Sequence, residues 1–188
     1  MAAPIRVGVL NDMSEVAPLA EHASAEVDQL LDTGADALVY LGLGVSAPAV
    51  ARAVDASGWK GPRAMNTAGL RGYQPEFARV IDGWMYVDMH SGLNTTLASL
   101  RQRLGISPAN SLAAAKGYDL GRLVAEGLAR APERTREGVK DGLELVKWLP
   151  AAQGHAGTLL GFGKHDRGAL HGRHLVMRQL LDGQSVEL

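Results

Sequence analysis

Residues 35–69 read ADALVYLGLGVSAPAVARAVDASGWKGPRAMNTAG, and this stretch decides the fold. Its first part, residues 35–43, is a short apolar run rich in β-forming residues, which predicts a buried strand. Ser46 then suits the first position of a helix, and Pro48 lies in the first turn, where its missing N–H costs nothing. Residues 62–65 predict another short strand. The stretch therefore predicts strand, helix and strand with short connections.

The same pattern extends toward the N-terminus. Residues 5–10, IRVGVL, predict a buried first strand that Asn11 and Asp12 close with turn chemistry. Residues 19–32 predict a helix with apolar residues on one face, which Gly34 ends. The resulting order, β-α-β-α-β, favours a mostly parallel sheet flanked by helices. We therefore expect an α/β protein with three layers, α-β-α.

The second half of the chain predicts one more strand, then helices, and then short extended pieces. Glycine recurs through residues 154–172, which indicates loops and short strands there, and Asp182-Gly183 is a strong hairpin signal. We expect a single α/β domain over 1–188, with an opening strand at 5–12, a sheet-forming segment at 19–90, a helical segment at 95–148 and closing strands at 154–188. The expected strands of the second half are 84–89, 174–180 and 184–188, and its expected helices are 95–104, 107–131 and 133–148.

Composition excludes several classes of function. Nineteen Lys and Arg against twenty Asp and Glu leave a net charge of −1, so the electrostatic case for binding nucleic acid is missing. The absence of cysteine excludes a disulfide scaffold and a thiol nucleophile. The start, MAAPIRVGVL, lacks the basic region of a signal peptide, and no apolar run is long enough to span a bilayer. We expect the chain as written to be cytoplasmic, and periplasmic or extracellular if a longer parent carries a signal.

Two enzyme hypotheses arise at residues 42–48. Glycines at a strand-to-helix turn are typical of nucleotide sites, which makes a Rossmann-like nucleotide-binding enzyme the third reading of the function. The acidic residue that should follow the next strand is absent from residues 62–67. Gly44-Val45-Ser46-Ala47-Pro48 also half-matches a hydrolase elbow, but proline replaces its last glycine. A helix cap explains Ser46 equally well. We expect no enzyme activity and no catalytic residues.

A metal site has little support in the histidine-containing segment. His165, Asp166, His171 and His174 lie among glycines, and His174 opens a predicted strand, on which residues three apart point to opposite faces. The pattern favours hydrogen-bonded or solvated loop histidines. We expect neither a metal nor another cofactor.

Several stretches, in order, resemble one protein family. These are 5–14 (IRVGVLNDMS), 35–69, 111–144 (SLAAAKGYDLGRLVAEGLARAPERTREGVKDGLE), 154–170 (GHAGTLLGFGKHDRGAL) and 174–183 (HLVMRQLLDG). They are similar to type I periplasmic binding proteins, the leucine and branched-chain amino-acid receptors of ABC transporters. Residues 35–69 look like the second-lobe segment of that family. Between Ser14 and Ala23 the chain lacks what would be most of the first lobe, so the resemblance implies a truncated two-lobe protein.

The resemblance implies a function and a site. The family binds a small molecule between its lobes, at the carboxyl ends of strands, and passes it to membrane subunits of an ABC transporter. Carried over to this sequence, the ligand contacts fall on Gly44, Val45, Ser46, Asn66, Thr67 and Ala68. Amino-acid binders of the family hold the ammonium group with an acidic residue in the second of these loops, where this chain has only uncharged residues. We therefore expect a non-catalytic binding protein for amino-acid-, amide- or short-acid-like molecules, with a neutral or amide-like ligand favoured.

An interaction module is the alternative from a different class of function. A sheet that lacks some of its neighbours leaves strand edges and apolar faces uncovered, which favours self-association or docking on a partner subunit. We keep a homo-oligomer as a candidate assembly for this reason.

Overall fold

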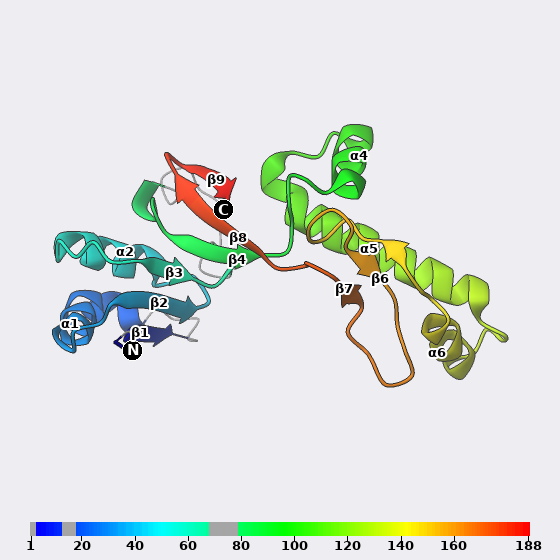
Figure 1. Ribbon diagram of the computed structural model, residues 1–188, viewed down its shortest axis with the longest axis horizontal. Coiled ribbons are helices and arrows are strands. Elements are labelled where there is room, and N and C mark those ends of the chain that lie inside the picture. The colour runs from blue at the N-terminus through cyan, green and yellow to red at the C-terminus, as the bar shows by residue number, and fades with distance from the viewer. Residues whose placement is uncertain (1–2, 13–17, 68–78) are drawn as a thin grey trace. The chain divides into compact units, whose positions relative to one another are not determined.

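The computed structural model describes residues 3–12, 18–67 and 79–188. Where the sequence predicts one domain, the contacts of the chain gather in two compact units (Figure 1). Unit 1 is Met1–Val87 with Met177–Leu188, and unit 2 is Asp88–Val176. None of the helices in the described ranges is long and apolar enough to cross a membrane.

Unit 1 is built on a six-stranded sheet in the order β1-β2-β3-β4-β8-β9. The pairs β1–β2, β2–β3 and β3–β4 are parallel, and β8–β9 is an antiparallel hairpin. This confirms the mostly parallel sheet. The strands are β1 (Val7–Asp12), β2 (Ala37–Gly42), β3 (Arg63–Met65), β4 (Met85–Asp88), β8 (Val176–Leu181) and β9 (Gln184–Glu187).

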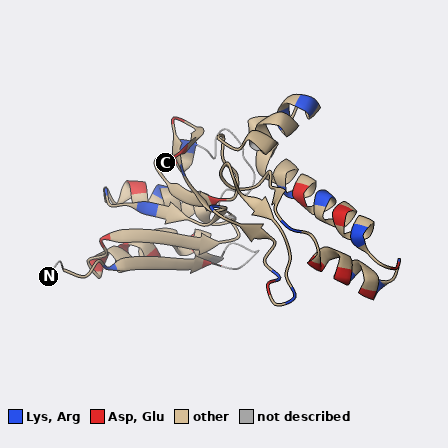
Figure 2. Ribbon diagram, turned by 45° about the vertical axis from the view of Figure 1, so that its right-hand side comes forward, with Lys and Arg blue, Asp and Glu red and all other residues tan. Residues whose placement is uncertain are grey.

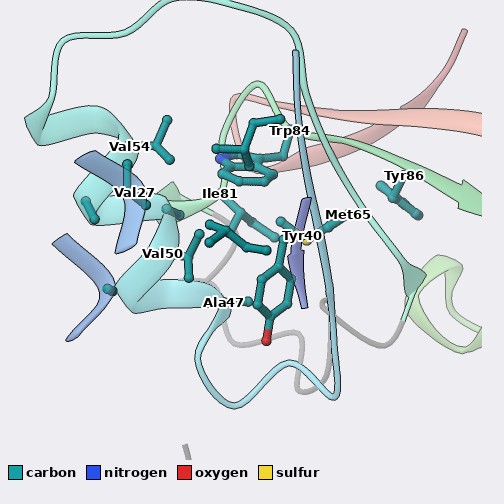
Figure 3. Close-up of a cluster of buried hydrophobic side chains, with 14 of the residues drawn as sticks. Val27, Tyr40, Ala47, Val50, Val54, Met65, Ile81, Trp84 and Tyr86 are labelled. Carbon is teal, nitrogen blue, oxygen red and sulfur yellow. The ribbon is translucent and has the colours of Figure 1, made fainter. Parts of the chain in front are cut away.

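One face of this sheet packs against two helices, α1 (Pro18–Asp32) and α2 (Ala47–Ala56). Right-handed crossovers between strands that follow one another in one direction place both helices on the same face. The core between the layers holds Val27 from α1, Val50 and Val54 from α2, and Tyr40 from β2, all of which are fully buried (Figure 3). On the opposite face, no helix of the described part of unit 1 packs against the sheet.

Unit 2 combines helices with a small antiparallel sheet. Leu123 of its longest helix packs with Val146, Ala151 and Leu160 in a separate apolar cluster. The elements are α4 (Thr95–Leu104), the 3-10 turn η2 (Pro108–Asn110), α5 (Ser111–Arg130), α6 (Arg136–Glu144), β5 (Leu149–Pro150), β6 (Leu159–Leu160) and β7 (Leu170–His171).

Two local predictions have different outcomes. The helix expected over 133–148 is shorter: Thr135 caps α6 by accepting a hydrogen bond from the Gly138 amide at 3.1 Å, and α6 ends at Glu144. Trp148 has a φ of 57°, which a right-handed helix does not tolerate. The apolar periodicity therefore overestimated the length of the helix. The hairpin at 182–183 is confirmed, because both residues have the positive φ of a tight hairpin turn.

Candidate functional site

The candidate site lies where β1, β2 and β3 end at their carboxyl edge. Parallel strands bring their carboxyl ends to one edge of a sheet, and open α/β sheets bind ligands outside that edge. Asp12, the last residue of β1, pairs in register with Gly42, the last residue of β2. Met65 ends β3 beside Tyr40, so Asn66 and Thr67 leave the sheet at the same edge. The structure therefore brings together the two turns in which the sequence predicts ligand contacts.

Asn66 joins these two turns directly. Its side-chain Nδ2 donates to the Gly42 carbonyl at 3.0 Å, and its Oδ1 accepts from the Gly42 amide at 3.3 Å. The Asn66 amide also donates to the Tyr40 carbonyl at 3.2 Å. The side chain thus replaces the hydrogen bonds that a longer β3 would make to β2. Asn66 shapes the edge of the site by holding the Gly42 turn in place.

Ser46 is fully buried at the start of α2. Its φ and ψ of −89° and −8° are helical, whereas a capping serine adopts an extended conformation, and its side chain makes no capping hydrogen bond. Within the described residues its hydroxyl has no hydrogen-bond partner. The interpretation of Ser46 as a side-chain cap is therefore wrong. The same lack of a partner means that no base is hydrogen-bonded to Ser46 there, so the hydrolase arrangement is not assembled.

Tyr40 and Asp12 are polar groups of this edge that sequence reasoning did not select. The Tyr40 side chain is fully buried under the turn, and a methyl group at Gly42 would overlap its hydroxyl. Burial raises the pKa of the Tyr40 hydroxyl, the charge of Asp12 raises it further, and the amides of Gly44 and Ser46 act in the opposite direction. A polar residue directly after a buried strand, as Asp12 is, was the available signal.

The remaining predicted residues have different surroundings. Gly44 is buried with a φ of 90°, which only glycine adopts without strain, and Val45 beside it is exposed. The Thr67 hydroxyl donates to the Val87 carbonyl, so it is used within the fold. Ala68 lies outside the described residues.

The histidines of the metal hypothesis all belong to unit 2. The Nε2 atom of His171 lies 3.1 Å from the Gly161 carbonyl oxygen, and the Nδ1 atom of His174 lies 3.1 Å from the Gly172 carbonyl oxygen. In the described ranges no three His, Cys, Asp or Glu residues are grouped as metal ligands would be. The ring nitrogens of His171, in β7, and of His174, outside the strands, each lie within hydrogen-bond distance of a backbone carbonyl.

Comparison with known proteins adds evidence from folds alone. The sequence matches no family model, and no curated protein matches it significantly. Among solved structures, it is similar to a leucine-binding protein from Thermotoga maritima (TM-score 0.66, 15% identity, 88% of this chain and 47% of that one). It is also similar to a type 1 periplasmic binding protein from Bordetella pertussis Tohama I, with a TM-score of 0.68 and 15% sequence identity. This match covers 97% of this chain and 60% of that protein. A third match is a branched-chain amino-acid ABC transporter protein from Thermus thermophilus with bound valine, with a TM-score of 0.63 and 12% sequence identity. This match covers 93% of this chain and 49% of that protein.

These matches cover 88% to 97% of this chain but only 47% to 60% of each neighbour. At 12% to 15% identity the likeness describes the fold and not the ligand. The mostly parallel sheet and its flanking helices agree with that likeness. The chain therefore has the fold of the type I periplasmic binding proteins over part of their length.

Proposed function

We propose that this protein binds a small amino-acid-, amide- or short-acid-like molecule, without chemically altering it, at the carboxyl edge of β1, β2 and β3. The observation that carries the proposal is the buried hydroxyl of Ser46, which lacks a partner in the described residues. A buried polar group without a hydrogen bond costs about 1–3 kcal/mol, so a ligand that supplies the bond recovers this energy.

The residues at this edge divide into two roles. The exposed Val45 offers the ligand an apolar surface, whereas the Ser46 hydroxyl is fully buried and has to become accessible before a ligand can bind it. Asn66 and Thr67 are positioning residues, since their side chains bind Gly42 and Val87. This assignment differs from the sequence-based expectation that the side chains of Asn66 and Thr67 contact the ligand.

Asp12 changes the expected class of ligand. The second loop lacks the acidic residue of amino-acid binders, which by itself favours a neutral compound. Asp12 places a carboxylate at the same edge from β1, in register with Gly42. An ammonium or amide N–H group of the ligand is attracted to that carboxylate, so amino acids and amides are favoured over simple acids.

Transport is the context that the neighbours suggest. Two of the matched structures are named as a leucine-binding protein and an ABC transporter protein with bound valine. We propose by analogy that this protein delivers its ligand to membrane subunits of an ABC transporter, in the periplasm or at the cell surface.

Thermal shift and calorimetry against a panel of amino acids, their amides and short carboxylic acids test the binding proposal. We expect at least one compound to raise the melting temperature of the wild type, and Ser46→Ala to lose this shift while the free variant melts at or above the wild-type temperature. Ser57→Ala is the matched control at the other end of α2, where the Ser57 hydroxyl donates to the Val54 carbonyl at 2.8 Å, and it should keep the ligand shift. A panel that leaves the wild type unchanged, or equal binding by Ser46→Ala, overturns the proposal.

A further inference from the structure

A pocket of about 320 Å³ lies within unit 2 and is lined mainly by α4 and α5. Pockets that bind small molecules usually measure about 300–1,000 Å³, so this one has room for a small ligand. Most of its lining side chains carry hydrogen-bond donors, and these are Thr95, Thr96, Ser99, Arg103, Tyr118 and Arg122. We call this space the α4–α5 pocket.

Helical spacing explains why these side chains share one pocket. Residues three and four apart lie on the same side of a helix. On α4 this spacing groups Thr96, Ser99 and Arg103. On α5 it places Arg122 one turn after Tyr118. The donors of two helices therefore converge on one space.

The walls of the α4–α5 pocket are held by contacts within unit 2. Asn94, which is buried, caps α4 because its Oδ1 accepts from the Leu97 amide at 3.0 Å. The Nδ2 atom of Asn94 donates to the Ala151 carbonyl at 3.0 Å, which ties the first turn of α4 to the segment after β5. Tyr118 of α5 packs against the apolar cluster that contains Leu97. A ligand therefore meets donors that are already in place, which lowers the entropic cost of binding.

The charged side chains of the α4–α5 pocket are both arginines, Arg103 and Arg122. α4 carries arginine and no acidic residue, so this helix shows blue without red in Figure 2. Neither arginine forms an ion pair with a described residue. The Cζ atom of Arg122 lies 5.8 Å from the centroid of the Tyr118 ring, and its Nη1 donates to the Pro150 carbonyl at 3.4 Å. These contacts orient Arg122 and leave most of its N–H donors available to a ligand.

The acidic residues of α5 are bound elsewhere. Asp119 accepts hydrogen bonds from the amides of Ala152 and Gln153 at 2.7 and 3.0 Å. Glu126 forms an ion pair with Arg130, which holds the pKa of the Glu126 carboxyl below its usual value. Neither carboxylate lines the α4–α5 pocket. The pocket therefore has a positive charge that the rest of unit 2 does not neutralise by an ion pair.

We propose that the α4–α5 pocket binds a phosphate monoester of a small organic molecule. Guanidinium groups bind carboxylates and phosphates through paired hydrogen bonds, and a phosphoryl group offers three acceptor oxygens. Two arginines and several hydroxyls supply more donors than the two oxygens of one carboxylate can accept, so phosphate is favoured. Leu100, which is buried, and Pro150 add an apolar surface for the organic part of the ester.

Calorimetry with phenyl phosphate tests this proposal, with inorganic phosphate and benzoate as comparison ligands at pH 8 in constant salt. We expect phenyl phosphate to bind with a Kd below about 1 mM, and both comparison ligands to bind more weakly. Absence of phenyl phosphate binding overturns the proposal. Equal binding of benzoate overturns the preference for phosphate, and equal binding of inorganic phosphate overturns an ester as the ligand.

Substitution of the two arginines tests their role. Arg103→Gln removes one cation, and it should weaken phenyl phosphate binding by at least about 10-fold. Arg122→Lys keeps the charge but loses the planar fork, so it should weaken binding by roughly 5-fold. Wild-type affinity in either variant overturns the proposal. Where circular dichroism shows that Arg122→Lys is unfolded, Ser99→Ala on the exposed side of α4 takes its place, and it should also bind phenyl phosphate more weakly.

Arg101→Gln is the matched control, because it removes the same charge from α4 outside the pocket. The Arg101 Nε donates to the Ile106 carbonyl at 3.4 Å, and this variant should bind phenyl phosphate as the wild type does. A loss as large as that of Arg103→Gln means that net charge alone attracts the ligand, and it overturns a built site.

Amide chemical shifts locate the bound ligand. Phenyl phosphate should shift the amide signals of residues 95–103 and 118–122 in unit 2 and leave those of β1, β2 and β3 in unit 1 unchanged. Shifts confined to unit 1 overturn the assignment to the α4–α5 pocket. Because the pocket belongs to unit 2 alone, this outcome is independent of binding at the carboxyl edge of β1, β2 and β3.

Discussion

Asn66 shows how a single side chain sets the geometry of the candidate site. It follows a strand of only three residues, β3, and its amide group continues the pairing with β2 that the backbone cannot make. The resemblance to type I periplasmic binding proteins implied that Asn66 contacts the ligand. Only the structure shows that both ends of the amide are used by Gly42.

Replacing Asn66 tests this positioning role. Asn66→Ala removes two partly buried hydrogen bonds, so the free energy of unfolding should fall by about 1–3 kcal/mol. Asn66→Asp retains the acceptor for the Gly42 amide but loses the donor, and it should also be destabilised. Urea denaturation followed by circular dichroism measures both. An Asn66→Ala variant as stable as the wild type contradicts the role.

Tyr40 predicts a pH dependence of stability. Burial first, and then the charge of Asp12, raises the pKa of the Tyr40 hydroxyl above its usual value of about 10. The unfolded chain therefore loses this proton at a lower pH than the folded chain does, and the free energy of unfolding falls as pH rises above about 10, toward the raised pKa.

Tyr40→Phe removes this titration. Between pH 10 and the raised pKa, the wild type should lose up to about 1.4 kcal/mol per pH unit more than Tyr40→Phe does. Equilibrium denaturation at pH 9, 10 and 11 gives the slope of the free energy of unfolding against pH for each of the two proteins. Parallel slopes for the two proteins are incompatible with a buried Tyr40 that holds its proton more tightly in the fold.

At the scale of elements, α5 and α6 pack through glycine. A Cβ atom at Gly142 would lie 2.8 Å from the Ala131 amide nitrogen and closer still to the Gly127 carbonyl. Backbone atoms cannot move aside as a flexible side chain does, so the two helices need glycine at this contact. The periodicity of residues 111–144 predicted both helices but not how closely they approach.

Gly142→Ala should destabilise unit 2 by about 2–4 kcal/mol, because the added methyl group overlaps the backbone of α5. Gly105→Ala is a poor control, since Gly105 has a φ of 63°. Gly117→Ala is the better one, because the space around it is open and alanine favours a helix, and it should be neutral or stabilising by up to about 1 kcal/mol. Amide hydrogen exchange of α5 and α6 measures the change. Equal effects of both substitutions contradict the steric argument.

At the scale of the whole molecule, the apolar clusters follow the two units. The cluster that contains Val27, Val54 and Trp84 draws only on unit 1, and the clusters around Leu123 and Leu97 draw only on unit 2. Because each unit has its own apolar cluster, the backbone amides of one unit can lose their protection from hydrogen exchange while those of the other keep it.

Val54→Ala tests whether the two units are stabilised independently. Val54 is fully buried, and losing its two methyl groups should cost unit 1 about 2 kcal/mol. Amides of β2 and β3 should then exchange faster by roughly 30-fold in dilute solution, while those of α5 keep their protection. Equal acceleration in α5 means that the chain unfolds as one cooperative unit.

The sequence by itself determined the order of the elements and the identity of the turns. The strand and helix of residues 35–56, the parallel pairing of the first strands and the hairpin at 182–183 are confirmed, because these depend on local periodicity and turn chemistry. Only the tertiary structure decided what the polar groups do. It placed Asp12 beside Gly42, buried Tyr40 under that turn and occupied the Asn66 amide, and it left one sheet face uncovered. These outcomes depend on register and on packing between segments distant in sequence, which no local pattern encodes.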